Sequence, residues 1–246
     1  MTIPDLSVVV PAFNEEARLQ AMLRSAVDYL RTREVEFEVL VVDDGSTDKT
    51  SELVGELGAE FPEIRVISLD RNRGKGHAVR TGVMQTSGRL VLFTDADGAT
   101  PMKELERLEP ALRDGADIAI GSRALRAEDV NLQVRWYRRA IGSVFRGFVA
   151  LLGTAGIGDT QCGFKLFEGT VARDLFGRSR IDGFAFDVEI LLLAQREGLS
   201  IAEIPVDWVH QDGSRINLAT DSLQMLGDLV RIRAKILLDQ FRRSRA

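Results

Sequence analysis

Two aspartates separated by one alanine, Asp95 and Asp97, directly follow the apolar stretch Leu90–Thr94. Two carboxylates this close at the end of a buried strand cost free energy unless a cation compensates their charge. Mg²⁺ and Mn²⁺ prefer carboxylate oxygens and complete their coordination with substrate phosphates and water. The pair is therefore a candidate metal site, although an acidic turn after a strand would show the same pattern.

A second acidic pair, Asp43 and Asp44, follows the apolar stretch Val39–Val42 and precedes a helical pattern. Ser46 is predicted to cap the N-terminus of that helix. Because a cap needs only one polar side chain, one of the two acids is free to accept hydrogen bonds from a uracil or a ribose. Structural capping alone is the alternative interpretation.

A glycine-rich segment, residues 72–77, places Lys75 between two glycines ahead of another helical pattern. Such a segment is typical of a phosphate cradle, in which the backbone approaches the ligand. The segment lacks the ending of a P-loop, and no three-glycine dinucleotide fingerprint follows the first strand, so triphosphate hydrolysis and hydride transfer are disfavoured. His77 and His210 are interpreted as structural histidines.

The elements that must position these residues are short apolar strands that alternate with helical patterns. Strands are predicted at Leu6–Val10, Glu38–Val42, Arg65–Ser68, Leu90–Thr94 and Asp117–Ile120. This alternation predicts an α/β fold with a mostly parallel central sheet and helices on both faces. Since ligands bind at the carboxyl ends of such strands, we expect the polar residues after four strands to converge on one site.

The second half is predicted to add further elements to the same domain, because it contains no repeat, linker or low-complexity segment. These elements are helices at Val134–Leu152 and Val188–Arg196, strands at Cys162–Phe167 and Ile201–Val206, and a last helix from Asn217 into a basic tail. One domain over residues 1–246 is therefore expected.

The composition excludes several classes of protein. A chain of 246 residues with 45% hydrophobic residues can bury one substantial core, and a net charge of −5 argues against an electrostatic nucleic-acid binder. Cys162 is the single cysteine, so an internal disulfide is excluded and a reducing compartment is favoured. No export signal or membrane-spanning stretch is recognised, so we expect any membrane contact to be peripheral.

Taken together, the motifs Val10–Glu16, Val42–Ser46 and Asp95–Asp97 resemble glycosyltransferase family 2. The segments Asn72–Gly76, Gly121–Arg123, Asp159–Phe167 and Ala185–Glu189 resemble the members of that family that glucosylate dolichyl phosphate. The resemblance implies a GT-A nucleotide-diphospho-sugar transferase fold. It also implies inverting transfer of a hexose, glucose from UDP-glucose, to a dolichyl or undecaprenyl phosphate with a β-linked product.

The resemblance also assigns roles to individual residues. Donor binding falls to Pro11, Phe13, Glu15, Asp43, Asp44, Lys75, Asp95 and Ala96; the metal, Mg²⁺ or Mn²⁺, to Asp95 and Asp97; and catalysis to Asp97, Arg123, Asp159 and Gln161. We further expect Arg123, Arg139 and Arg215 to hold the acceptor phosphate. Ala99 stands where related mannosyltransferases have glutamine, so no third protein ligand is expected there. Asp187 and Glu189 are weaker candidates, and a helix-start role for Asp187 is an alternative.

A lipid phosphate is already nucleophilic near neutral pH, so positioning and charge neutralisation suffice for transfer. Two other functions stay open, a family 2 transferase with a soluble or glycan acceptor and a non-catalytic sugar-nucleotide-binding protein. By the resemblance, residues 1–122 form the nucleotide-sugar half, residues 123–216 the acceptor half and residues 217–246 an amphipathic basic helix.

The segment Val134–Leu152 mixes aromatic residues with arginines, which is typical of a helix at a membrane interface. A core-packing helix with a solvated basic face is the alternative. With the family resemblance, we expect peripheral association with the cytoplasmic face of a membrane, either directly or through a membrane protein partner.

Overall fold

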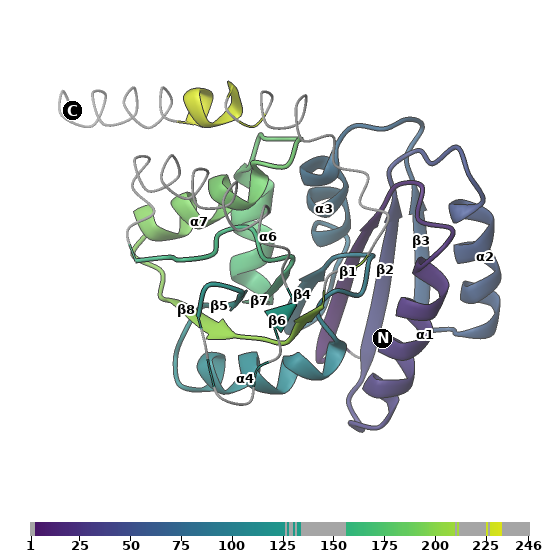
Figure 1. The fold of residues 1–246 in the computed structure, drawn as a ribbon, viewed down its shortest axis with the longest axis horizontal. Helices are drawn as coiled ribbons and strands as arrows, with labels where there is room; N and C mark the ends of the chain where they lie inside the picture. Colours follow the sequence, from purple (N-terminus) through teal and green to yellow (C-terminus); the bar gives the residue numbers. More distant parts are fainter. Residues whose placement is uncertain are drawn as a thin grey trace.

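The apolar strands of the sequence form a seven-stranded sheet, which the computed structural model shows at the centre of the molecule (Figure 1). The structure describes residues 3–125, 127, 130, 132–133, 156–209, 211, 225 and 227–232. The strand order is β3-β2-β1-β4-β7-β5-β8. The bounds are β1 Leu6–Ala12, β2 Phe37–Asp43, β3 Ile64–Ser68, β4 Leu90–Thr94, β5 Ile118–Ser122, β7 Phe164–Glu168 and β8 Ile201–Pro205.

Neighbouring strands of this sheet pair in parallel except at β7, which is antiparallel to both β4 and β5. The predicted mostly parallel sheet is therefore confirmed, while the reversed strand between β4 and β5 was not anticipated. Two short strands, β6 at Leu132–Gln133 and β9 at Trp208–Val209, pair in parallel as a separate small sheet.

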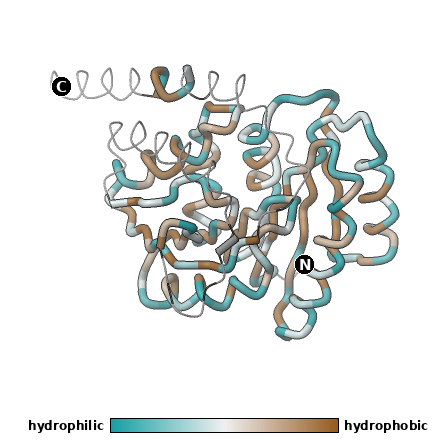
Figure 2. Tube along the Cα trace, viewed as in Figure 1, coloured by the Kyte–Doolittle hydropathy of each residue, from teal (hydrophilic) through white to brown (hydrophobic). Residues whose placement is uncertain are grey.

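Helices cover both faces of the large sheet, as predicted. One apolar layer contains side chains from α1 (Leu19–Arg31), α2 (Thr50–Glu60) and α4 (Leu105–Arg113), with a short 3₁₀ turn, η1 (Met102–Glu104), ahead of α4. The other layer contains side chains from α3 (Lys75–Val83), α6 (Gly169–Arg178) and α7 (Phe186–Arg196). Strands β1 and β5 are buried along their whole length, whereas the edge strands β3 and β8 are partly exposed. Burial on both faces explains why the inner strands read as continuous apolar runs (Figure 2).

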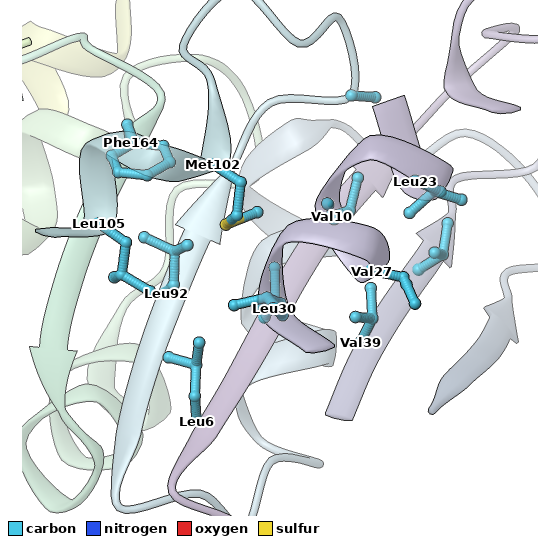
Figure 3. Packing of buried hydrophobic residues seen from close by; sticks show 14 of the residues in the cluster. Leu6, Val10, Leu23, Val27, Leu30, Val39, Leu92, Met102, Leu105 and Phe164 are labelled. Carbon is cyan, nitrogen blue, oxygen red and sulfur yellow. The ribbon is translucent and has the colours of Figure 1, made fainter. Parts of the chain in front are cut away.

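Strand β1 illustrates how the sequence builds the two layers. Val8 and Val10 point into the layer with α1, whereas Val9 points into the layer with α3. On α1, Leu23 and Leu30 lie on the face that packs against these strands (Figure 3). Apolar side chains that recur every second residue in the strand and about every 3.6 residues in the helix are therefore buried together in one core.

The second half adds elements that the sequence did not indicate. Helix α6 was not predicted, and α7 begins at Phe186, two residues before the predicted Val188. Residues 225 and 227–232 are helical, with Leu229 and Ile232 buried in the layer of α6 and α7. The predicted helix over residues 134–152, and the rest of the last helix, lie outside the described residues. Within the described ranges, no helix combines the length and apolarity needed to cross a bilayer.

Candidate active site

A cavity of about 210 Å³ lies at the carboxyl ends of β1, β2 and β4. It is lined by residues from these strand ends and from the start of α3, namely Pro11, Ala12, Phe13, Glu15, Arg18, Asp44, Asn72, Gly74, Lys75, Ala78, Asp95, Ala96, Asp97 and Phe184. The polar segments after β1, β2, β3 and β4 all contribute to this lining. The predicted convergence of four strand ends is therefore confirmed.

The loops after β1 and β2 are joined through the side chain of Asn14. Its backbone has a φ of 55°, a left-handed conformation that asparagine tolerates better than most residues, and its Oδ1 accepts a hydrogen bond from Thr47 N at 2.8 Å. Asn14 N donates to Ser46 Oγ at 2.9 Å, so Ser46 closes this loop pair. The prediction that Ser46 caps a helix is wrong, because α2 begins only at Thr50 and follows Lys49 without a side-chain cap.

The two acids after β2 have separate tasks. Asp43 Oδ1 accepts from Ser46 N at 3.0 Å, and the residue is buried outside the cavity lining. Asp44 lines the cavity and accepts from Arg73 N and Gly74 N, both at 2.8 Å. Burial raises the pKa of Asp44, and these two amide groups partly offset that rise. Of the pair, only Asp44 is placed to meet a ligand.

An ion pair crosses the cavity between α3 and the end of β4. Lys75 Nζ lies 2.6 Å from Asp95 Oδ1 and 5.4 Å from the centre of the Phe93 ring. Burial lowers the pKa of Lys75, but the carboxylates of Asp95, Asp187 and Asp97 outweigh that effect and leave the pKa above its usual value. Lys75 therefore stays a cation in the cavity.

Asp97 is the less compensated of the two carboxylates after β4. Its Oδ1 accepts from Ala99 N at 3.0 Å, while burial and the nearby charge of Asp95 raise its pKa. Arg18, paired with Glu15 at 2.7 Å between Nη2 and Oε1, lies close enough for its pKa to be raised by Glu15 and also by Asp97 and Asp95. The site concentrates negative charge that a bound cation would relieve.

The donor atoms suit a hard divalent cation. Asp95 and Asp97 supply carboxylate oxygens in one cavity, which Mg²⁺ and Mn²⁺ prefer. In the described part of the chain, no cluster of three or more His, Cys, Asp or Glu side chains could hold a metal ion. Two carboxylates leave most of the coordination shell to substrate phosphates and water, so these residues fit a metal that binds together with its substrate.

The glycine-rich segment before α3 is arranged differently from a phosphate cradle. Its amide groups at positions 73 and 74 donate to Asp44, and the loop between α6 and α7 fills the space that Gly74 and Gly76 leave open. A Cβ at Gly74 or Gly76 would overlap the carbonyl oxygens of Asp182 or Ile181. The two glycines thus admit protein backbone, and the amides at positions 73 and 74 are not free to cradle a phosphate as predicted. Gly74 and Lys75 both line the cavity, and Lys75 brings its charge there as predicted.

A second polar cluster lies beside the cavity, after β5. Arg123 donates to Asp159 through Nε at 2.7 Å and Nη2 at 2.8 Å, and its guanidinium stacks 5.6 Å from the Trp208 ring centre. Burial alone would raise the pKa of Asp159, but Arg123 lowers it to about 2. Glu203 accepts from Asp159 N at 2.8 Å and from Ser122 Oγ at 2.6 Å, which fixes the pair to the sheet.

The second cluster is linked to the first through the turn before β7. Gln161 N donates to Asp159 Oδ1 at 3.2 Å, and Asp95 N donates to Gly163 O at 3.0 Å. Arg123, Asp159 and Gln161 do not line the cavity, although they adjoin it. Burial raises the pKa of the Cys162 thiol to about 12, so this cysteine stays protonated.

A buried ion pair next to the site joins β7 to α7. Lys165 Nζ lies 2.5 Å from Asp187 Oδ1 and 2.6 Å from Cys162 O, and both side chains are almost fully buried. The Phe93 ring lies 5.7 Å from this ammonium and 5.4 Å from that of Lys75. Asp187 is in the first turn of α7, as predicted, but its carboxylate pairs with Lys165.

Some candidate residues cannot be placed in the site, and some residues that line the cavity were not candidates. Arg139 and Arg215 lie outside the described residues. Arg18, Asn72 and Phe184 line the cavity although none of them was a candidate site residue; Asn72 is the first residue of the glycine-rich segment. Arg18 carried one signal, its place three residues after Glu15, whereas Phe184 comes from a loop whose packing only the fold reveals.

Comparison with known proteins gives three consistent findings. The profile of "Glycosyl transferase family 2" matches residues 7–176. Dolichyl-phosphate beta-glucosyltransferase from Dictyostelium discoideum is 41% identical over 245 residues, which cover 95% of this chain and 75% of that protein. The Homo sapiens protein of the same name is 40% identical over 250 residues, which cover 96% and 77%.

The fold is also similar to that of a solved enzyme. Glucosyl-3-phosphoglycerate synthase from Mycobacterium tuberculosis, solved with Mn²⁺, UDP-glucose and phosphoglyceric acid, superimposes with a TM-score of 0.71. The match covers 94% of this chain and 80% of that one at 22% identity. At this identity the likeness concerns the fold.

Proposed function

Because the chain belongs to glycosyltransferase family 2, we propose that it transfers glucose from UDP-glucose to a polyprenyl phosphate with inversion, forming a β-linked glucosyl phosphate. The observation that carries the proposal is the convergence of Asp44, Lys75, Asp95 and Asp97 on one cavity at the strand ends. Two relatives named as dolichyl-phosphate glucosyltransferases share 41% and 40% of their aligned residues with this chain, which supports glucose as the sugar and a polyprenyl phosphate as the acceptor.

The donor occupies the cavity at the ends of β1, β2 and β4. Pro11, Phe13 and Glu15 line it beside the carboxylate of Asp44, which supports their role in holding uridine. Lys75 is a cation in the same cavity, so it can stabilise the diphosphate by charge. The cavity thus offers an apolar wall for a base and a positive charge for phosphate.

Asp95 and Asp97 would hold a divalent cation, Mg²⁺ or Mn²⁺. Their shared cavity and oxygen donors support this, as does the Mn²⁺ found with UDP-glucose in the mycobacterial synthase. A cation held there would supply positive charge to offset the negative charge of the departing UDP. Burial and the neighbouring Asp95 raise the pKa of Asp97, which is the effect that a bound cation would oppose.

The acceptor phosphate binds beside the second cluster. Arg123, held by Asp159, is positioned for it, and Arg139 and Arg215 are proposed as further contacts. A phosphate oxygen of the lipid attacks C1 of glucose, the bond from C1 to the UDP oxygen breaks, and UDP leaves. Because that phosphate is already an anion, Asp159 and Gln161 orient groups rather than remove a proton.

The lipid acceptor implies work at a membrane surface. We place the enzyme peripherally at the cytoplasmic face, with the aromatic and basic residues of segment 134–152 in the interface or a membrane protein partner nearby.

The test is transfer of radiolabel from UDP-glucose to a short polyprenyl phosphate, measured as organic-extractable product. We expect product with Mg²⁺ or Mn²⁺, its loss with a chelator, and a large loss in Asp97→Ala. Asp114→Ala, which removes an exposed carboxylate after α4, serves as the matched control and should keep full activity. GDP-mannose and other UDP-sugars, run in parallel, test the choice of donor.

Water-soluble labelled product without lipid product would contradict the proposed acceptor and point to a soluble or glycan acceptor. Donor binding without turnover on any acceptor would instead favour a non-catalytic sugar-nucleotide-binding protein.

A further inference from the structure

Phe184 is an aromatic residue that belongs to neither apolar layer of the core. It begins the triplet Phe184-Ala185-Phe186, which leads into α7. Ala185 and Phe186 are buried, and the Phe186 ring packs edge-on against Phe93 with centroids 5.6 Å apart. Phe184 is only partly buried and lines the cavity. A large apolar ring held at a cavity wall is available to a ligand.

The loop that carries Phe184 is fixed in place by a buried carboxylate. Glu189 Oε2 accepts from Arg180 N and from Ile181 N, both at 2.8 Å. The next residue, Asp182, accepts through its carbonyl oxygen from His77 N at 3.2 Å. These bonds tie the loop to α7 on one side and to α3 on the other, so the ring position is set before a ligand arrives.

The same loop reaches the part of the cavity that Asp44 lines. Gly74 and Gly76 lack side chains where the loop backbone approaches, and a Cβ at either would overlap it. Gly74 N, on its other side, donates to Asp44 at 2.8 Å. The loop before Phe184 and the carboxylate of Asp44 therefore meet at Gly74, and Phe184 lines the same cavity as Asp44, the group proposed to hold uridine.

We infer that Phe184 is a donor-binding residue whose ring packs against the nucleoside of the UDP donor, and that Glu189 positions it. The inference rests on the proposed function, since it assigns a wall of the same donor cavity. Nucleobases present a flat π face, and stacking on an aromatic side chain contributes measurably to their binding. Glu189 acts only through the loop and does not touch the donor.

The test is calorimetric titration of the full chain with UDP alone, which has the nucleoside and diphosphate but no sugar. Phe184→Ala and Phe184→Leu should bind UDP about tenfold more weakly than the wild type, as expected when a stacking ring is lost. Phe184→Tyr keeps the ring and should bind nearly as well as the wild type. Met84→Ala, which removes a half-exposed apolar side chain at the far end of α3, is the control and should leave the affinity unchanged.

Glu189 is tested through its coupling to the ring. Glu189→Ala should also weaken UDP binding, whereas the double variant with Phe184→Ala should bind no more weakly than the weaker single variant. A carboxylate that merely stabilised the fold would give additive losses. Steady-state kinetics should agree, with a raised KM for UDP-glucose and little change in kcat for Phe184→Ala.

Equal UDP affinity in the wild type, Phe184→Ala and Phe184→Leu would overturn the inference, even if UDP-glucose binding changed, because the ring would then face the sugar. Additive losses in the double variant would overturn the role of Glu189. Failure of the wild type to bind UDP at all would count against the proposed function instead, so the two failures are distinguishable.

Discussion

Replacing Gly163 by alanine should disable the site through one misplaced carboxylate. A Cβ built on Gly163 overlaps the carboxylate of Asp95, and ordinary van der Waals contact begins only at 3.4 Å. Asp95 cannot follow the backbone away, because its own N donates to Gly163 O at 3.0 Å. Its side chain must therefore withdraw by about 1 Å or more, which separates it from Lys75 and from the cation site.

The magnitude follows from two separate effects. Overpacking at a buried position costs about 1–3 kcal/mol of unfolding free energy, so most of the protein should stay folded. A displacement of about 1 Å in a reacting constellation costs about 100-fold in rate, so kcat/KM should fall by about that factor. Glucosyl transfer at several Mn²⁺ concentrations measures the second effect, and urea unfolding measures the first.

Gly82→Ala is the matched control for this variant. Its Cβ would lie 2.5 Å from Val9 Cγ1 and 2.9 Å from Val42 Cγ2, between α3 and the sheet and away from the carboxylates. We expect a similar loss of stability with kcat/KM close to that of the wild type. If Gly163→Ala were as active as Gly82→Ala at equal stability, the position of the Asp95 carboxylate would not control the reaction.

Two further predictions concern the ion pairs. Asp159→Asn should lower the unfolding free energy by about 2 kcal/mol at pH 7, because the pKa of Asp159 in the folded protein, about 2, lies below that of an aspartate in the unfolded chain. This stabilisation is present above about pH 4 and is lost as the pH falls through 2. Acid titration followed by circular dichroism should show the difference from the wild type shrinking over that range, and a constant difference would contradict it. Lys165→Met should cost about 3 kcal/mol or more, since it leaves Asp187 buried without its partner. Urea unfolding measures this loss. In the double variant with Asp187→Leu, part of the lost stability should return. Purely additive losses would refute the argument that Lys165 and Asp187 stabilise the protein as a pair.

The sequence predicted the strands of the first half of the chain and the convergence of their ends. Strand β4 has the predicted bounds, Leu90–Thr94, because a buried parallel strand reads as an apolar run that ends in polar residues. The acids after β2 and β4 meet at one cavity because parallel strands end at the same edge. The GT-A fold implied by the family resemblance is likewise confirmed.

The features that the sequence did not predict depend on contacts between segments that are far apart in the chain. The sequence of a short strand such as Phe164–Glu168 does not specify the direction in which it pairs, so the reversal of β7 is set by the surrounding fold. The glycines at 74 and 76 signal a close approach, but the sequence does not say whether a ligand or the loop at Asp182 approaches. Phe184 has no signal of its own, because an aromatic residue before an apolar helix is usually part of the core.

The place of β7 in the sheet has a consequence for synthesis on the ribosome. Both neighbours of β5 in the sheet, β7 and β8, are translated after it, and residues 123–163 separate β5 from β7. At about 5–20 residues per second, β5 waits about 2–8 s as an unpaired strand, while β4 waits with one open edge. Exposed edges of this kind attract other chains. The nascent protein therefore has its period of greatest aggregation risk between the two halves of its sequence, when the cavity residues of the first half are already translated but the strand that locks Asp95 in place is not.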